Sequence, residues 1–211
     1  MKKSLFQLCV AVLCLFRVTG LVAGDKPAVK RDSDAAKMRA GIVFETLAID
    51  PEVFTRVEGG KKSVMVPVHE WDYGVKLFTA AEWKKRNYKK GEFRGLAEVV
   101  ADKVLQEAQL EFIRDRRDVV LYAVIRSEDP FLSSILLSKK FLPKFKKNMG
   151  EIVRVVIVDR HELYVFPDSG GKLDEYGPVL AQRYKTTRQP VSLEIFQVSD
   201  KGLKIIGTLG R

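Results

Sequence analysis

The chain has 211 residues and a formal net charge of +10, with 37 basic against 27 acidic side chains and only two cysteines. Both cysteines, Cys9 and Cys14, lie in an apolar stretch near the N-terminus. The remaining residues therefore cannot form disulfides, thiolate nucleophiles or cysteine-ligated zinc sites, and their stability has to come from packing. About 187 residues are enough for one domain with a core that needs no covalent support.

Residues 1–24 are typical of a secretory signal peptide. Lys2 and Lys3 precede a mostly apolar run over residues 5–16, which spans only about 18 Å as a helix and falls short of the ~30 Å hydrocarbon core of a bilayer. Small residues before Asp25 offer a cleavage point. We expect export to the periplasm, the cell surface or the medium, with no membrane span after cleavage. An uncleaved N-terminal anchor is the alternative.

The segment after the leader, residues 25–40, is polar and predicts a flexible lead-in. Beyond it, β-prone runs over residues 41–57 precede a turn signal at residues 58–61 and another β-prone run over residues 63–69. This order predicts a hairpin. Pro67 cannot donate to a sheet ladder, so the last of these strands is expected to lie at a sheet edge or to end near Pro67.

A short helix is predicted from Ala80. Thr79 and Glu82 fit a capping box at its start, and Phe78 and Trp83 occupy the two positions of a hydrophobic staple. The following sequence, NYKKG, breaks the apolar pattern and ends the helix.

A long amphipathic helix is predicted over residues 92–114, where apolar side chains recur at intervals of three or four. The apolar run over residues 119–125 is typical of a central strand covered on both faces. A third helix is expected to begin at Asp129 and to run towards Lys140. Pro143 then kinks or ends it.

The last part of the chain is predicted to contain strands joined by turns and by a loop over residues 167–178. These strands are expected over residues 152–158, 162–166, 179–184, 191–198 and 203–208. Early strands, central helices and late hairpins indicate a single α+β domain over residues 41–211. It should have a mainly antiparallel sheet and about three helices.

The chain has two histidines, and a glutamate follows each of them, as His69–Glu70 and His161–Glu162. Brought together, these side chains would make a metal site or a general acid–base pair. The two pairs lack an H-E-x-x-H spacing, and neighbouring strand residues point to opposite faces. Surface or turn roles are therefore favoured, and the sequence predicts no metal site. It also predicts no cofactor, because its glycine pairs lack the spacing of a phosphate-binding loop.

Four consecutive residues, Glu70, Trp71, Asp72 and Tyr73, form the densest cluster of aromatic and acidic side chains. Flat rings that stack on sugars, beside acids that bind hydroxyl groups, are typical of carbohydrate subsites. The four residues are therefore candidate glycan contacts. An ordinary strand end, with Trp71 packed and Tyr73 in solvent, is the alternative.

Two groups of basic side chains are candidate contacts for a partner or a polyanion. They follow the first and third predicted helices and comprise Lys84, Lys85, Arg86, Lys89, Lys90, Lys139, Lys140, Lys144, Lys146 and Lys147. Phe141 and Phe145 alternate with the second group, which indicates an amphipathic end suited to an anionic polymer, a membrane surface or a protein groove. Lysines that complement helix dipoles and keep the surface soluble are the alternative.

Without the leader, 34 basic side chains remain against 27 acidic ones, for a net charge of +7. This surplus fits an anionic partner or ordinary solubility. No catalytic motif is found, which favours a non-enzymatic protein. We expect an exported envelope or cell-surface component that binds an envelope or surface protein or an anionic polymer. Nucleic acid is not expected, and peripheral membrane contact is left open. The alternative is an extracytoplasmic enzyme or binding module that acts on glycans or other envelope polymers.

Overall fold

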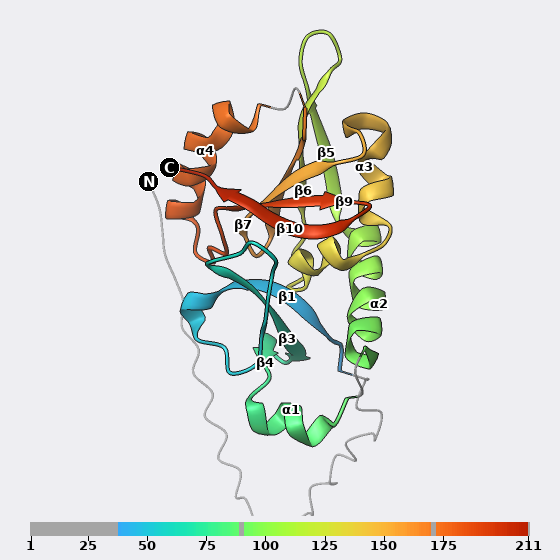
Figure 1. Ribbon diagram of the computed structural model, residues 1–211, viewed down its shortest axis with the longest axis vertical. Helices are drawn as coiled ribbons and strands as arrows, with labels where there is room; N and C mark the ends of the chain where they lie inside the picture. The colour runs from blue at the N-terminus through green and yellow to red at the C-terminus, as the bar shows by residue number, and fades with distance from the viewer. Residues whose placement is uncertain (1–37, 89–90, 170–171, 211) are drawn as a thin grey trace, which may run out of the picture. The chain divides into compact units, whose positions relative to one another are not determined.

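The computed structural model describes residues 38–88, 91–169 and 172–210, which carry two antiparallel sheets, four α-helices and two short 3-10 helices (Figure 1). These residues belong to one compact unit that begins near Ala36. The predicted α+β class with antiparallel pairing is confirmed. The predicted leader and most of the predicted lead-in lie outside the described residues.

The smaller sheet is built around strand β3 (Ser63–Trp71), which has β1 (Ala40–Thr46) on one side. Strands β2 (Thr55–Arg56) and β4 (Gly74–Leu77) follow one another along its other side. The predicted hairpin before residue 69 is confirmed as the β2–β3 pair. A short 3-10 helix, η1 (Leu47–Ile49), follows β1.

Pro67 lies in the middle of β3, which is paired on both sides and continues to Trp71, so the prediction of an edge strand or of a strand end near Pro67 is wrong. The backbone N–H of Phe78 donates to the Pro67 carbonyl at 3.3 Å, and the nitrogen and carbonyl of one strand residue point to the same side. On that side, β2 pairs with β3 only as far as Met65, and β4 begins to pair at Val68. The missing N–H of Pro67 therefore falls in the gap between β2 and β4, where no ladder bond is lost.

The larger sheet has six strands in the order β10–β9–β7–β8–β6–β5, and every pair is antiparallel. Their bounds are Gln109–Arg114 for β5, Val120–Arg126 for β6, Val153–Asp159 for β7, Glu162–Pro167 for β8, Glu194–Ser199 for β9 and Gly202–Thr208 for β10. The predicted hairpins β7–β8 and β9–β10 are confirmed, as is the internal position of β6.

The first helix, α1 (Ala80–Arg86), has the predicted start. The Thr79 hydroxyl accepts from the backbone N–H of Glu82 at 3.2 Å, and the Glu82 carboxylate accepts from the backbone N–H of Thr79 at 2.9 Å. The rings of Phe78 and Trp83 lie 5.5 Å apart, as a hydrophobic staple requires. These bonds lower the pKa of Glu82 to about 2, chiefly through the Thr79 backbone.

The second helix, α2 (Glu92–Glu107), is shorter than predicted because the chain turns into β5 at Gln109. Phe112, expected on the helix, therefore lies in a strand. The predicted third helix is also corrected. It is a 3-10 helix, η2 (Leu132–Leu137), followed by α3 (Phe141–Met149). Pro143 lies in the first turn of α3, where a missing N–H breaks no intrahelical bond.

A fourth helix, α4 (Leu173–Thr186), replaces the loop and the strand predicted over residues 167–184. Its buried residues, Leu173, Gly177 and Leu180, recur at a helical spacing. Leu173 and Leu180 pack on Val156 and Phe166 of the larger sheet. Gly177 and Pro178 resemble helix breakers in the sequence, but burial of this apolar face outweighs the bond that Pro178 cannot make.

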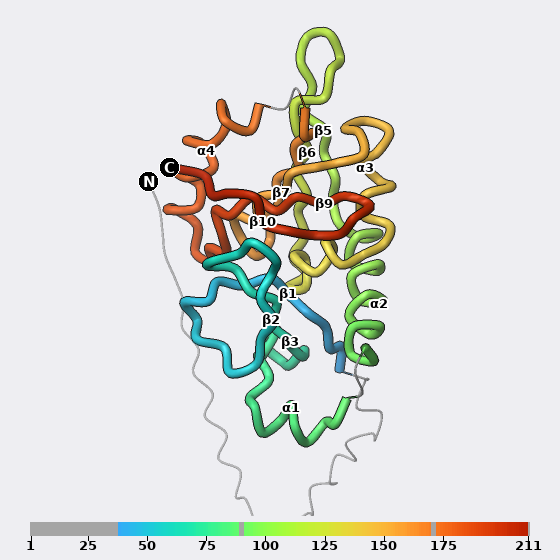
Figure 2. The backbone as a smooth tube through the Cα atoms, viewed as in Figure 1, coloured from blue at the N-terminus to red at the C-terminus, as the bar shows by residue number. Residues whose placement is uncertain are grey.

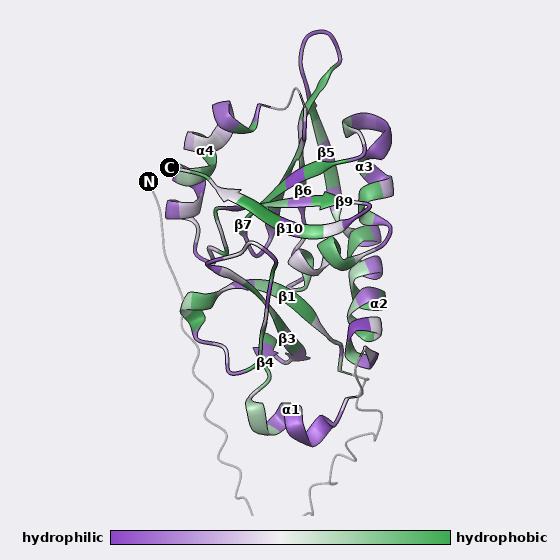
Figure 3. Cartoon of the chain, in the orientation of Figure 1, coloured by the Kyte–Doolittle hydropathy of each residue, from purple (hydrophilic) through white to green (hydrophobic). Residues whose placement is uncertain are grey.

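The main core contains residues of both sheets, of α2 and of the η2–α3 segment. Figure 3 shows hydrophobic colour along β1, β6 and β9, whereas α1 is largely hydrophilic. Val64, Val66 and Val68 of β3 are fully buried, and each such side chain stabilises the fold by roughly 1.5–3 kcal/mol. The two sheets therefore share the main core, and the larger sheet forms a second, smaller cluster with α4.

Polar bonds also join the two sheets. The buried carboxylate of Glu194 accepts from the backbone N–H groups of Lys61, Lys62 and Ser63 at 2.8, 3.1 and 2.7 Å. Burial opposes ionisation of Glu194, but the hydrogen bonds outweigh it and lower the pKa. Figure 2 shows the turn before β3 beside β10, where the N–H of Ile205 donates to the Glu58 carbonyl at 2.7 Å.

Candidate functional site

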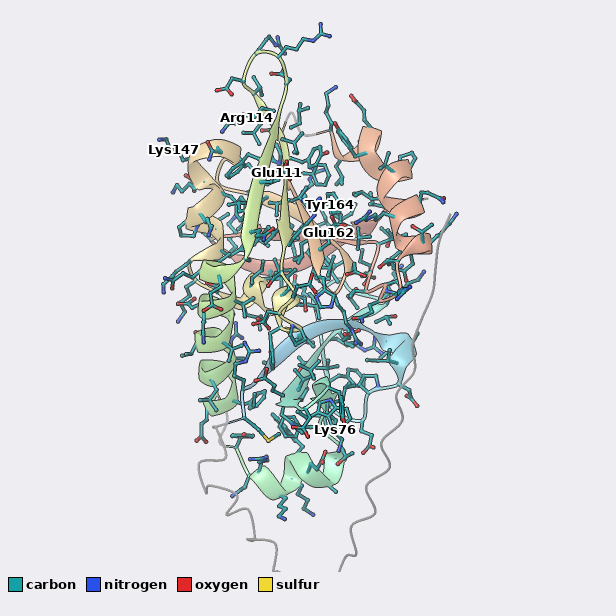
Figure 4. All side chains as sticks on the ribbon, turned by 180° about the vertical axis from the view of Figure 1, so that it is seen from behind. Lys76, Glu111, Arg114, Lys147, Glu162 and Tyr164 are labelled. Carbon is teal, nitrogen blue, oxygen red and sulfur yellow. The ribbon has the colours of Figure 1, made fainter. Side chains whose placement is uncertain are left out.

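The β3–β4 hairpin and α1 bring together two groups of candidate residues that the sequence treated separately. Lys76 of β4 pairs with Glu82 of α1 at 3.2 Å, and Lys76 is labelled near α1 in Figure 4. His69 lines a pocket of about 340 Å³ together with Lys85 and Arg86. We call this surface, with the hairpin tip at residues 71–74 and the basic end of α1, the hairpin–α1 face.

The hairpin tip exposes two aromatic rings. Trp71 is 47% exposed and Tyr73 is 83% exposed, and the rings meet edge to face with their centroids 5.1 Å apart. Trp71 therefore packs on Tyr73 rather than in the core, unlike the packed strand end that was the alternative. Asp72, between them, makes no hydrogen bond or ion pair with any residue that the structure describes. The tip presents two exposed rings and one unpaired carboxylate to solvent.

Glu70, the fourth candidate glycan contact, is bound within the fold. Arg39 donates to both of its carboxylate oxygens, at 2.9 and 3.0 Å, and also to Asp129 at 2.6 Å. The hydrogen bond with Glu70 is the main reason that the pKa of Arg39 is raised. This bridge joins the residue before β1 to β3 and to the segment before η2, so Glu70 has a structural role.

The basic end of α1 is free of acidic partners within the described part of the chain. Lys84 and Lys85 are exposed and make no ion pair there, while Arg86 lies 6.0 Å above the ring of Phe78. They extend from the last turn, where positive charge also complements the helix dipole. Lys89 and Lys90 lie outside the described residues.

The second basic group is mostly bound to its own fold. Lys139 pairs with Glu98 at 3.1 Å, Lys140 with Asp102 at 2.7 Å and Lys146 with Glu151 at 2.8 Å, and Lys144 donates to the Leu105 carbonyl at 3.1 Å. Phe141 and Phe145, which alternate with this group in the sequence, are fully buried and do not contribute to its exposed surface. Lys147 alone in this group has no partner among the described residues, and it points away from α3 (Figure 4).

The two histidines lie on different sheets and contact different neighbours. The ring of His69 lies 4.9 Å from the ring of Phe78, and Nδ1 of His161 lies 2.9 Å from the Ser127 carbonyl. Across residues 38–88, 91–169 and 172–210, no group of three or more His, Cys, Asp or Glu side chains is placed to hold a metal ion.

Sequence reasoning missed a charged group at the end of the larger sheet. Glu162 begins β8 and is buried, and its two carboxylate oxygens accept from Nε of Arg126 at 2.8 Å and from Nε of Arg183 at 2.9 Å. Tyr164 follows on the same face of the strand (Figure 4). Burial, with the nearby charge of Glu162, raises the pKa of Tyr164 to about 12. Arg126 and Arg183 come from β6 and α4, so no sequence spacing could reveal this group.

Comparison with known protein families, curated proteins and solved structures finds no match. None of the helices among the described residues combines the length and apolarity needed to cross a bilayer.

Proposed function

We propose that this chain is an exported, non-enzymatic protein that binds another macromolecule of the cell envelope or surface through the hairpin–α1 face. The exposed pair of Trp71 and Tyr73 carries the proposal. Large aromatic side chains contribute strongly to binding when a partner covers them, and contiguous exposed apolar surface is typical of interaction sites.

The basic end of α1 supports an acidic or anionic partner, whereas Asp72 is the charged residue of the aromatic tip itself. Lys84 and Lys85 make no ion pair within the described residues, so they are available to a partner's carboxylates or phosphates. Rim charges of this kind increase association rates and select partners of opposite charge. The buried acids Glu45, Glu162 and Glu194 bind arginine side chains or backbone N–H groups, which supports binding over catalysis.

Site-specific photo-crosslinking in the source cell tests the proposal directly. A photoreactive residue in place of Tyr73 should give a discrete crosslinked product. The same residue in place of Val179, another largely exposed side chain, which lies on α4, should give none. The Lys84→Glu, Lys85→Glu double variant should reduce the Tyr73 product at least about tenfold. Equal products at positions 73 and 179, or none at 73, would contradict the proposal.

A glycan or another envelope polymer is the second candidate occupant, and the unpaired Asp72 between two exposed rings favours it. Sugar stacking on Trp71 should shift its fluorescence emission. Because Trp83 also emits, a Trp71→Phe variant identifies which ring responds. A shift in the wild type that Trp71→Phe abolishes would support a polymer ligand. A protein-sized crosslinked product with no such shift would support a protein partner.

A further inference from the structure

A polar cleft of about 510 Å³ opens at the end of the larger sheet, away from the residues of the hairpin–α1 face. Its walls come from the end of β6, the β7–β8 turn, the end of α4 and the segment that follows α4. This volume is within the range of small-ligand sites, roughly 300–1,000 Å³. The charged residues in its lining are Arg126, Arg183, Arg188, Glu128, Asp159 and Glu162. We call it the α4 cleft.

Two of the arginines are fixed in place and retain free donors. The buried carboxylate of Glu162 engages Nε of Arg126 and Nε of Arg183, whereas a guanidinium group carries five N–H donors. The terminal nitrogens of Arg183 make no hydrogen bond to any other described residue. A guanidinium group held at one edge presents its other edge in a fixed orientation, which suits a ligand carboxylate.

Two further charged side chains in the lining, Arg188 and Glu128, have no partner among the described residues. They flank the β7–β8 turn on opposite sides. The N–H of Ser127 donates to the His161 carbonyl at 3.2 Å on the β8 side, and the N–H of Arg160 donates to the Gln189 carbonyl at 3.2 Å on the β7 side. At about 4.8 Å per strand spacing, three spacings separate the two flanking segments by roughly 14 Å.

The acidic and basic side chains of the lining are equal in number, three of each. Asp159 is engaged within the fold, because it accepts from the His161 N–H at 2.8 Å and from the Thr187 hydroxyl. The unpaired side chains are therefore Arg188 at one side and Glu128 at the other side. Further donors come from Arg183 and from Arg126, whose Nη1 also donates to Glu111 at 3.1 Å. Such a balance favours a ligand that carries both signs of charge over phosphate or a polyanion.

We propose that the α4 cleft binds a short peptide with unmodified termini. Arg188 and Arg183 bind its terminal carboxylate, and Glu128 binds its terminal ammonium group. Side chains extend into the cleft from both flanking segments, so the charges of the ligand must lie closer together than the ~14 Å between the backbones. An extended chain covers about 3.3–3.6 Å per residue, so a dipeptide or a tripeptide fits this span and covers more of it than a single amino acid does.

Isothermal titration calorimetry tests this assignment on the exported form of the chain purified from the source cell. The probes are alanine, dialanine and trialanine, together with the N-acetylated and C-amidated forms of the last two. Dialanine or trialanine should bind more tightly than alanine. Acetylation and amidation should each weaken binding about tenfold or more, because each removes one charge-assisted hydrogen bond.

Three variants assign the two ends of the peptide. Glu128→Gln should bind free and acetylated peptides equally, and Arg188→Ala should bind free and amidated peptides equally. Arg116→Ala is the matched control, because Arg116 is an exposed arginine at the β5–β6 turn with no partner among the described residues. It should leave every affinity unchanged. All three positions are exposed, and circular dichroism should show the wild-type fold in each variant.

Several results would overturn the proposal. Among them are no binding of any free peptide at about 1 mM, equal affinity for free and capped peptides, and an equal loss in Arg116→Ala and Arg188→Ala. Failure of peptide binding would not affect the proposed function. The Lys84→Glu, Lys85→Glu variant, which disrupts only the hairpin–α1 face, should bind peptides as the wild type does.

Discussion

The basic end of α1 and the basic stretch from Lys139 to Lys147 have similar compositions but different neighbours. Glu98, Asp102 and Leu105 lie along one stripe of α2, and they receive Lys139, Lys140 and Lys144 in turn. Lys84 and Lys85 meet no such stripe within the described residues. Whether a run of lysines binds its own fold or remains free for a partner thus depends on acids some 40 residues away in the sequence.

The largest difference between these two basic regions is expected in partner binding. Reversing charge at α1, with Lys84→Glu and Lys85→Glu, should weaken partner capture by an order of magnitude or more while leaving the fold intact. Lys147→Glu, which reverses the one unpaired charge of the other group, should have no effect on capture. Quantitative binding to the crosslinked partner measures both. Similar losses in the two variants would mean that only the total charge matters.

The second-largest effect is expected on the free energy of unfolding, at the α2 residues that bind the stretch from Lys139 to Lys147. Asp102 accepts from Lys140 and, at 2.5 Å, from the Ser138 hydroxyl. Asp102→Ala should therefore reduce the free energy of unfolding by about 1–2 kcal/mol. Glu107→Ala on the same helix is the control, because its pair with Lys103 is 4.0 Å long and 58% exposed on the glutamate side. It should change stability by less than about 0.5 kcal/mol. Urea denaturation compares the two.

The contribution of Asp102 should depend on pH. The hydrogen bonds with Lys140 and Ser138 lower its pKa below the ordinary value of 3.8. A lowered pKa in the folded state gives stability that is fully present above the unfolded value and is lost as the pH falls through the folded value. The difference in unfolding free energy between wild type and Asp102→Ala should be constant from pH 5 to 7 and shrink below about pH 4. A difference that grows in acid would contradict the assignment.

The smallest effect is expected from single truncations of unpaired lysines. Lys84→Ala and Lys147→Ala each remove an exposed side chain with no partner among the described residues, so each should change the unfolding free energy by less than about 0.5 kcal/mol. Thermal unfolding measures this. A destabilisation above about 1 kcal/mol at Lys84 would show that the basic end of α1 also supports the fold.

Sequence patterns predicted the elements whose signals are local. Thr79 and Glu82 start α1 as expected, and the turns after Asp159 and Ser199 join their predicted hairpins. The errors occur where tertiary contacts decide. Gln109–Arg114 continues the apolar spacing of α2 but pairs with β6, and α4 forms across Pro178 because its apolar face is buried on the larger sheet.

The sequence predicted which residues belong to the candidate site, but not which of them are exposed or paired. The sequence singled out Trp71, Tyr73, Lys84 and Lys85, but their exposure depends on how the hairpin and α1 lie in the fold. It also singled out Glu70 and Lys140, whose partners Arg39 and Asp102 lie about 30 to 40 residues away. Sequence shows which groups are present, whereas partner choice emerges only when distant segments meet.

The Glu194 carboxylate bears on the order in which the fold is completed. Its partners at Lys61, Lys62 and Ser63 precede it by 133, 132 and 131 residues. The turn that leads into β3 therefore emerges early in synthesis but obtains hydrogen bonds for these three N–H groups only after β9 has been made. Long-range closure of this kind slows folding and keeps early strands exposed for longer. A ribosome-bound chain that stops short of β9 should leave the smaller sheet open to protease, and completion of the last hairpin should protect it.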